Sequence, residues 1–199
     1  MIVISVAFIG VAPDTEWSRS IVVVLQSATL FVALWTSGMT KYARASLILV
    51  GLALLASVGL ILNPEDTILG LVGILELLLT LGIATTVGLG VVDQGKVNAQ
   101  SVIGAICIYL LVGLIFTFLY GSVAALDSGP FFSQGTDGTP SLRTYFSYVT
   151  LSTVGYGDYS AASNLGHMLS ITEALLGQLY LVTVVAVLVS RMRPGGEAA

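Results

Sequence analysis

The chain has few charged residues, one cysteine and one histidine. Asp, Glu, Lys and Arg make up 9% of its 199 residues, whereas 56% are hydrophobic. Because so few charges are scattered among long apolar runs, the composition excludes a soluble globular protein and indicates an integral membrane protein. The net charge is −4 and no cluster of Lys or Arg is present, which argues against a nucleic-acid partner.

The single Cys and the single His leave little room for catalysis. Cys107 lies inside an apolar run and has no second cysteine with which to form an intramolecular disulfide. Neither Cys107 nor His167 has partners at the spacing of a catalytic triad or a metal site. We therefore expect no enzymatic activity and no cofactor.

Apolar segments of about 20 residues recur along the chain. An α-helix needs about that length to cross a hydrocarbon core of about 30 Å. Strict alternation of polar and apolar residues, which marks a membrane β-barrel, is absent, so we predict an all-α membrane protein. Five segments are long enough to span: residues 17–37, 43–62, 67–92, 100–126 and 165–190.

Residues 1–12 are also apolar, but as a helix they would reach only about 18 Å. They form either a short or tilted first membrane helix, which would raise the number of spans to six, or a helix that lies in the interface. No basic residue precedes them and no small-x-small cleavage site is evident before Pro13, which disfavours a signal peptide. We favour a short first membrane helix.

The basic residues indicate the orientation. When the five long segments are threaded in order, five of the seven Lys and Arg residues fall on one side of the bilayer: Lys41, Arg44, Lys96, Arg191 and Arg193. The positive-inside rule makes that side cytoplasmic. The C-terminus is then cytoplasmic, and the connection between the last two spans is external.

That last connection carries the most specific motif of the chain. Residues 127–140 are polar and rich in glycine, and residues 141–152 fit a three-turn helix with Ser141 as its N-cap. The run TVGYGD follows at residues 153–158. The helix is too short to cross a bilayer, so it would enter part way, where irregular backbone is tolerated only beside protein and water or ions.

From about residue 100 onward, the outer helix, short pore helix, TVGYGD run and inner helix resemble the pore domain of tetrameric potassium channels. The likeness extends to small prokaryotic channels that have membrane helices before the pore. It implies that filter carbonyls replace the hydration shell of K⁺. The implied ligands are the carbonyls of Thr153, Val154, Gly155 and Tyr156, with the Thr153 hydroxyl.

The resemblance also implies an assembly and a support for the filter. One chain supplies one loop and a closed ring needs four, so a homotetramer is expected. Behind the filter, Tyr145 or Tyr148 would donate a hydrogen bond to Asp158. Gly155 and Gly157 would let the backbone reach conformations closed to other residues, so that successive carbonyls turn towards one axis.

The candidates for gating lie on the inner helix. Gly177 falls at the hinge position of the family, where a glycine serves either bending or close helix packing. Val185 and Val189 would approach the pore axis near the cytoplasmic end and form an apolar constriction.

Other ionisable groups do not form a conventional voltage sensor. Residues 67–92, the fourth of six spans, contain no Lys or Arg. Glu76 in that segment has either a structural hydrogen bond or a role in sensing protons or ions. Glu173 is expected to pair with Gln178 or with the pore helix, and His167 is an ordinary interfacial residue or an external pH sensor.

These observations divide the chain into N-terminal membrane helices (1–98), a pore domain (99–190) and a short cytoplasmic tail (191–199). Within the pore domain we place the pore helix at 141–152, the filter at 153–158 and the inner helix at 165–190. We predict passive, potassium-selective conduction across the cell membrane, with a separate regulatory protein as a candidate partner for gating. A non-selective cation channel and a non-conducting accessory or scaffold subunit are the alternatives.

Overall fold

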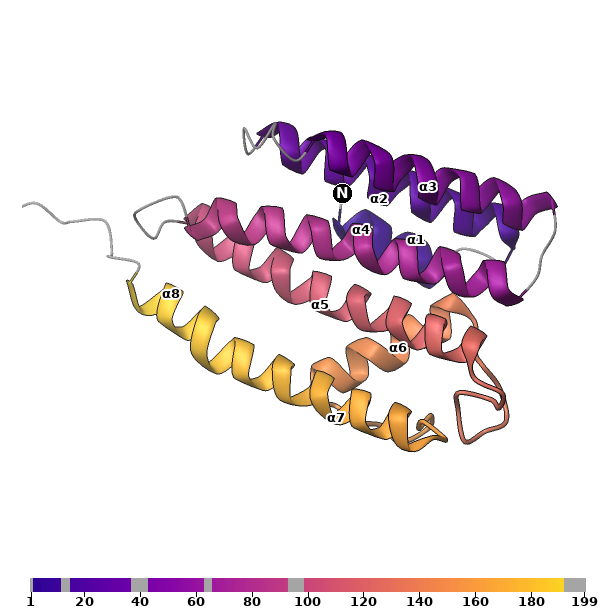
Figure 1. Ribbon diagram of the computed structural model, residues 1–199. Coiled ribbons are helices and arrows are strands. Elements are labelled where there is room, and N and C mark those ends of the chain that lie inside the picture. Colours follow the sequence, from indigo (N-terminus) through magenta and orange to yellow (C-terminus); the bar gives the residue numbers. More distant parts are fainter. Residues whose placement is uncertain (1, 12–14, 37–42, 63–65, 93–98, 192–199) are drawn as a thin grey trace, which may run out of the picture.

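The computed structural model describes residues 2–11, 15–36, 43–62, 66–92 and 99–191, and helices dominate these residues. The all-α prediction is confirmed, and each predicted span agrees with a helix within one residue at either end (Figure 1). The helices are α1 (Ile2–Val11), α2 (Glu16–Thr36), α3 (Ala43–Leu62), α4 (Asp66–Val92), α5 (Ala99–Leu126), α6 (Pro140–Leu151), α7 (Asn164–Leu179), the π-helical η2 (Tyr180–Val185) and α8 (Ala186–Arg191).

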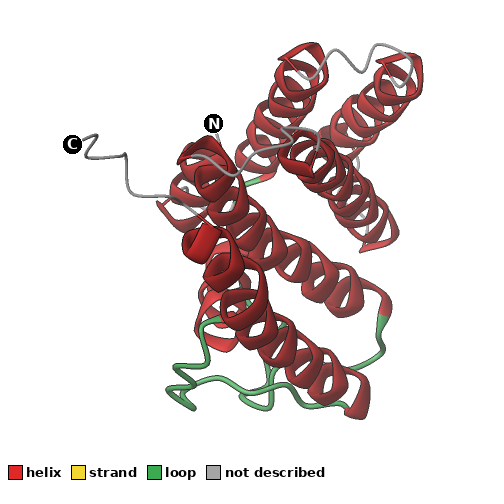
Figure 2. Cartoon of the chain, turned by 90° about the vertical axis from the view of Figure 1, so that its left-hand side faces the viewer, coloured by secondary structure: helices red, strands yellow, loops and turns green. Residues whose placement is uncertain are grey.

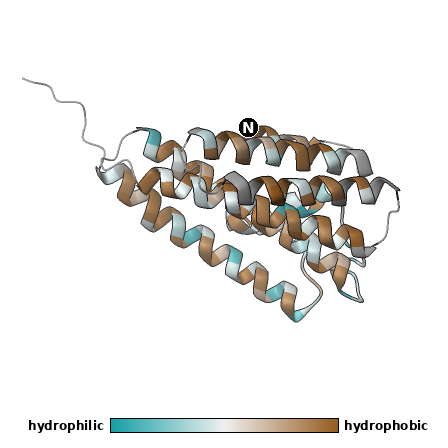
Figure 3. Cartoon of the chain, turned by 45° about the horizontal axis from the view of Figure 1, so that its top comes forward, coloured by the Kyte–Doolittle hydropathy of each residue, from teal (hydrophilic) through white to brown (hydrophobic). Residues whose placement is uncertain are grey.

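The described helices are composed mainly of hydrophobic residues, which are coloured brown in Figure 3. Among the described residues, three helical runs are long and apolar enough to cross a membrane: Ile68–Val92, Ala99–Leu126 and Asn164–Leu188. The runs Ile2–Val11 and Ser20–Trp35 are apolar but shorter. The chain is therefore an integral membrane protein, and the larger number of five or six spans stays a prediction.

Helices α4 and α5 form the central pair of the bundle, with α2 and α3 on the far side of α4 (Figure 1). Their shared core contains side chains with at most 2% exposure: Leu79, Ile83, Leu111 and Leu114. Gly73 allows a close approach, since a Cβ there would lie 2.8 Å from the Ser122 hydroxyl. Small residues at such contacts are typical of membrane helices, whose packing depends on van der Waals contact.

The short helix α1 lies against the start of α6. Its end is fixed by the Ser141 hydroxyl, which donates to the Gly10 carbonyl at 3.0 Å. At 10 residues, α1 extends about 15 Å, half of a hydrocarbon core. Residues 2–11 alone are therefore too short to cross the hydrocarbon core, and they form a short helix that packs against α6 with Ser5 and Ile9 buried.

The loop between α5 and α6 is held by an aromatic cluster that the polar, glycine-rich composition of residues 127–140 did not reveal. Phe131 and Phe132 are almost fully buried and contact Phe146 of α6, with ring centroids 6.2 and 5.2 Å away. The backbone of this loop also pairs with the segment after the filter, through Ala162 N–H to Phe131 O at 2.8 Å. Figure 2 shows these loops gathered at one end of the bundle. The cluster therefore ties both flanks of the filter together.

The inner helix is continuous from Asn164 to Arg191 but changes its hydrogen-bond pattern at η2. The Thr183 hydroxyl bonds back to the Leu179 carbonyl, and the Tyr180 hydroxyl donates to the Ala105 carbonyl of α5 at 2.8 Å. A π-helical turn inserts extra backbone into a helix and is commonly found at functional positions. The helical run thus agrees with the predicted inner helix (165–190), and it contains a π segment, not anticipated from the sequence, that begins three residues after Gly177.

Candidate ion-conduction site

The pore helix α6 begins at Pro140, one residue earlier than predicted. Its N-cap is Thr139, whose side chain accepts a hydrogen bond from the Leu142 N–H at 3.1 Å. Pro140 suits the first helical position because its missing N–H would have no partner within the helix. The prediction of Ser141 as the cap is therefore wrong, because that hydroxyl binds α1 instead.

The filter segment continues directly from the end of the pore helix. The Val149 carbonyl accepts the N–H groups of Val154 and Gly155 at 3.0 and 3.3 Å, and the Thr153 N–H donates to Thr150 at 2.9 Å. The N–H groups at the start of the filter segment thus donate to carbonyls of the pore helix. The conformation of the segment is therefore coupled to the position of α6.

Every second residue of the segment has a left-handed backbone. The φ angles are +57° at Thr153, +56° at Gly155 and +77° at Gly157, whereas Val154 and Tyr156 between them have negative φ. When right-handed and left-handed backbone conformations alternate, successive peptide groups have the same orientation. The carbonyl groups then lie on one side of the segment and the N–H groups on the other. Thr153 is the only non-glycine residue with positive φ among the described residues, and such strain is concentrated at functional sites.

The filter segment has one side open in the single chain. Val154 is 52% exposed and Tyr156 is 70% exposed, and a Cβ at Gly155 or Gly157 would meet no atom within 4 Å. In a membrane protein, such backbone must face other protein, water or ions. The open side is therefore available for further chains and for permeating ions.

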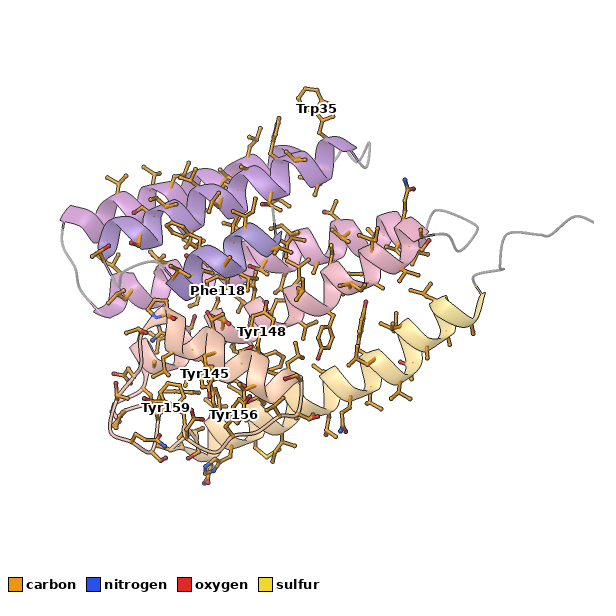
Figure 4. All side chains as sticks on the ribbon, turned by 180° about the vertical axis from the view of Figure 1, so that it is seen from behind. Trp35, Phe118, Tyr145, Tyr148, Tyr156 and Tyr159 are labelled. Atoms are coloured by element: carbon orange, nitrogen blue, oxygen red, sulfur yellow. The ribbon has the colours of Figure 1, made fainter. Side chains whose placement is uncertain are left out.

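Tyr145 connects α6 to the C-terminal end of the filter segment. Its hydroxyl donates to Asp158 Oδ2 at 2.7 Å, and its ring stacks parallel to that of Tyr156 with centroids 6.4 Å apart (Figure 4). On the other side, the Gln134 amide donates to the Asp158 carbonyl at 2.8 Å. The bond to Asp158 raises the pKa of the Tyr145 phenol to about 12, so the phenol keeps its proton at neutral pH.

The second tyrosine considered for this role has a different position. The Tyr148 hydroxyl donates to the Leu110 carbonyl of α5 at 2.6 Å, and its ring lies where a Cβ on Gly113 would be, at 2.6 Å. Figure 4 shows Tyr148 on the side of the bundle, away from Tyr145 and Tyr156. The prediction that Tyr148 donates to Asp158 is therefore corrected, because this side chain anchors α6 to α5.

Removing the Tyr145 hydroxyl should loosen the outer end of the filter. In Tyr145→Phe the stack on Tyr156 remains and the Tyr159 N–H still donates to Asp158 Oδ1, but Asp158 Oδ2 loses its donor. We therefore expect ion currents that decay several-fold faster in low external potassium. The matched control is Tyr159→Phe, a nearby tyrosine whose ring packs on Phe132. Because the pKa of Tyr145 is raised, its bond is fully present below about pH 10 and is lost as the pH rises through about 12. An unchanged decay in Tyr145→Phe would contradict the supporting role.

Gly177 lies beneath the end of the pore helix. A Cβ at this position would overlap the Leu151 carbonyl oxygen and lie 3.0 Å from the Leu151 carbonyl carbon. The Tyr109 hydroxyl donates to the same carbonyl at 3.3 Å. Of the two roles considered for Gly177, the structure thus shows close packing, and bending at this residue stays a prediction.

Glu173 meets the pore helix one turn before Gly177. Its carboxyl is fully buried and lies 2.5 Å from the Ser147 hydroxyl of α6 and 2.5 Å from the Tyr120 hydroxyl of α5. Pairing with the pore helix was one of two expected arrangements and is the one observed, whereas Gln178, the other expected partner, is exposed. Tyr120 was missed, although the spacing of Glu173 and Gly177 on one helix face was a signal that this face meets protein.

The remaining candidates are spread over the chain. Val185 is half-buried within η2, and the side chain of Val189 lies outside the described residues. Glu76 is 7% exposed in α4, far along the chain from the filter. His167 is exposed, and its Nε2 lies 2.8 Å from the Ala161 carbonyl. The structure does not bring these residues to the filter, and of the predicted tail only Arg191 is described.

Comparison with known families agrees with this geometry. Residues 105–193 match the family model described as "Ion channel", which covers most of α5 and everything to the end of the inner helix. The match supports an ion channel domain in this part of the chain and fits a protein that is not an enzyme. Neither the comparison with curated proteins nor that with solved structures gave a significant match.

Proposed function

We propose that this chain is one subunit of a potassium-selective channel that conducts passively. The observation that carries the proposal is the alternation of backbone hand at Thr153, Gly155 and Gly157 within the run TVGYGD. Rings of backbone carbonyls that replace the water around an ion are the basis of potassium selectivity. The ligands would be the carbonyls of Thr153, Val154, Gly155 and Tyr156, together with the Thr153 hydroxyl.

The pore helix supplies a favourable field for a cation. It ends at Leu151, immediately before the filter, and a helix carries partial negative charge at its C-terminal end. A bare cation is otherwise costly at membrane depth, so an aligned helix end lowers the free energy of an ion beyond the filter. Four such helices would add their fields at one axis.

Four chains are proposed because one chain leaves both the filter and the inner helix uncovered. Of the most apolar stretch of the inner helix, 11% is buried within the chain, against 39% for each of the other two long helices. A closed ring of four copies would cover part of this surface and complete the filter. The proposed assembly is therefore a homotetramer in the cell membrane, with the pore loop external and the C-terminus cytoplasmic.

Gating is proposed to depend on something other than a conventional voltage sensor. Residues 67–92, which form α4 apart from its first residue, contain no Lys or Arg to move in the field. Val185 and Val189 are the proposed apolar constriction below Gly177, with η2 as the segment where the inner helix can change its register. A separate regulatory protein is the candidate source of the stimulus.

The test is the reversal potential of the purified protein in lipid vesicles or planar bilayers. With potassium on one side and sodium on the other, we expect a reversal potential close to the potassium equilibrium potential. A reversal potential near zero would instead support a non-selective cation channel. Absence of current at every voltage, pH and lipid composition tried would favour the non-conducting scaffold.

A further inference from the structure

Glu173 is an acidic residue buried within the pore domain. It is 0% exposed, and its carboxyl lies where α7 packs against both α5 and α6. The titratable groups whose charge interacts with it are phenols: Tyr109 and Tyr120 of α5 and Tyr148 of α6. On α6, the cation Arg143 donates to the carbonyls of Asp137 and Gly138 at the outer end of that helix. The described hydrogen-bond partners of Glu173 are thus neutral hydroxyls.

Three close oxygen–oxygen contacts connect Glu173, Tyr120, Ser147 and Gly113, and each needs one proton between its two atoms. Tyr120 OH lies 2.5 Å from Oε2, Ser147 Oγ lies 2.5 Å from Oε1, and Ser147 Oγ also lies 2.7 Å from the Gly113 carbonyl oxygen. A hydroxyl carries one proton, so Ser147 can donate to Glu173 or to Gly113 but not to both. With an ionised Glu173, one of these close oxygen pairs would have no proton between its atoms.

A protonated Glu173 satisfies all three contacts. Its own proton is donated to Ser147 Oγ, the Ser147 proton is donated to the Gly113 carbonyl, and the Tyr120 proton is donated to Oε2. The neutral form also removes the cost of an ionised carboxylate at membrane depth with no cation bound to it. Hydrogen-bond counting and burial thus favour the same protonation state.

We infer that Glu173 is a proton-carrying positioning residue, whose neutral carboxyl fixes the pore helix between the outer and inner helices and thereby holds the filter. The inference rests on the proposed channel function. Ser147 precedes by two residues Val149, whose carbonyl accepts two N–H groups of the filter. Glu173 and Gly177 contact Ser147 and Leu151, so the two helices touch at positions one turn apart on each.

The decisive comparison is between Glu173→Gln and Glu173→Ala. A glutamine amide reproduces one donor and one acceptor, so Glu173→Gln should keep the potassium-to-sodium permeability ratio of the wild type. Glu173→Ala leaves both Ser147 and Tyr120 without this partner, and we expect the ratio to fall about tenfold, a factor that corresponds to about 1.4 kcal/mol. The matched control is Thr172→Ala on the same helix, where an exposed hydroxyl donates to the Met168 carbonyl.

The pH dependence separates positioning by a proton from positioning by shape alone. Loss of the Glu173 proton would break the chain of donors, so wild-type selectivity should decline as the pH rises, whereas Glu173→Gln should not respond. The range from about pH 6 to 9 is suitable, because it lies below the ordinary phenol pKa of about 10. Equal pH responses in the two proteins would overturn the inference.

A spectroscopic measurement keeps the inference independent of conduction. The infrared difference spectrum between wild type and Glu173→Gln in detergent at neutral pH should contain the carbonyl band of a protonated carboxylic acid. A carboxylate band in its place would overturn the inference, even if the wild type conducts potassium. Conversely, wild-type protein with the acid band and no current would refute the proposed function and leave the protonation state established.

If Glu173→Ala fails to assemble, Ser147→Ala tests the same contact with a smaller change.

Discussion

Gly155→Ala abolishes potassium-selective flux and leaves the assembled protein intact: this is the largest functional effect that we expect from a single added methyl group. Gly155 has φ +56°, and an added Cβ would meet no atom within 4 Å of the chain. The methyl group thus acts through the backbone and not through a collision inside the subunit. A left-handed conformation costs an L-residue about 1–2 kcal/mol, which is less than the about 5–15 kcal/mol that stabilises a typical folded protein.

The loss of function should be much larger than the loss of stability. Relief of the strain turns the peptide group of Gly155 away from its position, and each chain then withdraws a carbonyl from the proposed ring of ligands. Four altered chains in one ring change every ligand of that layer at once. We therefore expect no potassium-selective flux from vesicles, together with an unchanged elution volume in gel filtration.

Gly135→Ala is the matched control for this experiment. Gly135 has φ +78° and an equally open Cβ position, but it lies in the loop between α5 and the pore helix. The same strain at that position should leave selectivity unchanged. Retained selectivity in Gly155→Ala, or its loss in Gly135→Ala, would refute the assignment of the filter carbonyls.

Gly177→Ala should have the largest effect on stability. The added Cβ would overlap the Leu151 carbonyl oxygen and lie 3.0 Å from Leu151 Cδ1, and the carbonyl belongs to backbone that cannot rotate away. Overpacking of this kind costs about 1–3 kcal/mol, and occasionally more, because the helices must separate. In this protein the separated element would be the pore helix itself, so both the melting temperature in detergent and the conductance should fall.

The control for Gly177→Ala is Gly59→Ala, because Gly59 lies in α3 with no atom within 4 Å of an added Cβ. An alanine in a helix interior is favoured over glycine by about 0.5–1 kcal/mol, so Gly59→Ala should leave the melting temperature unchanged or raise it. If Gly177→Ala keeps its melting temperature but alters opening, bending at Gly177 is its main role. If it loses stability as expected, close packing is the main role.

The helices of this fold were predictable because their signal is local. Continuous apolar runs of the length of a bilayer are legible in the sequence, and each predicted span matched a helix within one residue. The aromatic cluster of Phe131 and Phe132 was not predicted, because its partners come from other elements and the surrounding composition is that of a loop. The π segment at η2 was missed for a similar reason, since no residue type marks it.

For the site, the sequence indicated the segment and two candidate donors to Asp158, but not which of the two reaches it. The TVGYGD run and its two glycines placed the filter, and the structure shows left-handed backbone at both glycines and also at Thr153. Which tyrosine reaches Asp158 depended on how α6 is rotated, and this rotation is decided by packing against α5. Tyr145 and Tyr148 are three residues apart and lie on similar faces of α6, so from the sequence alone either could be the donor to Asp158.

The sequence by itself determined an all-helical membrane protein, the position of the TVGYGD run between its last two long helices and the backbone freedom at Gly155 and Gly157. Length, hydropathy and residue type suffice for these properties because each depends on near neighbours in the chain. Only the tertiary structure decided the partners of Glu173, which are 26 and 53 residues away. A buried carboxyl must find its hydrogen bonds wherever packing places donors, and that choice is made by three helices meeting at one point.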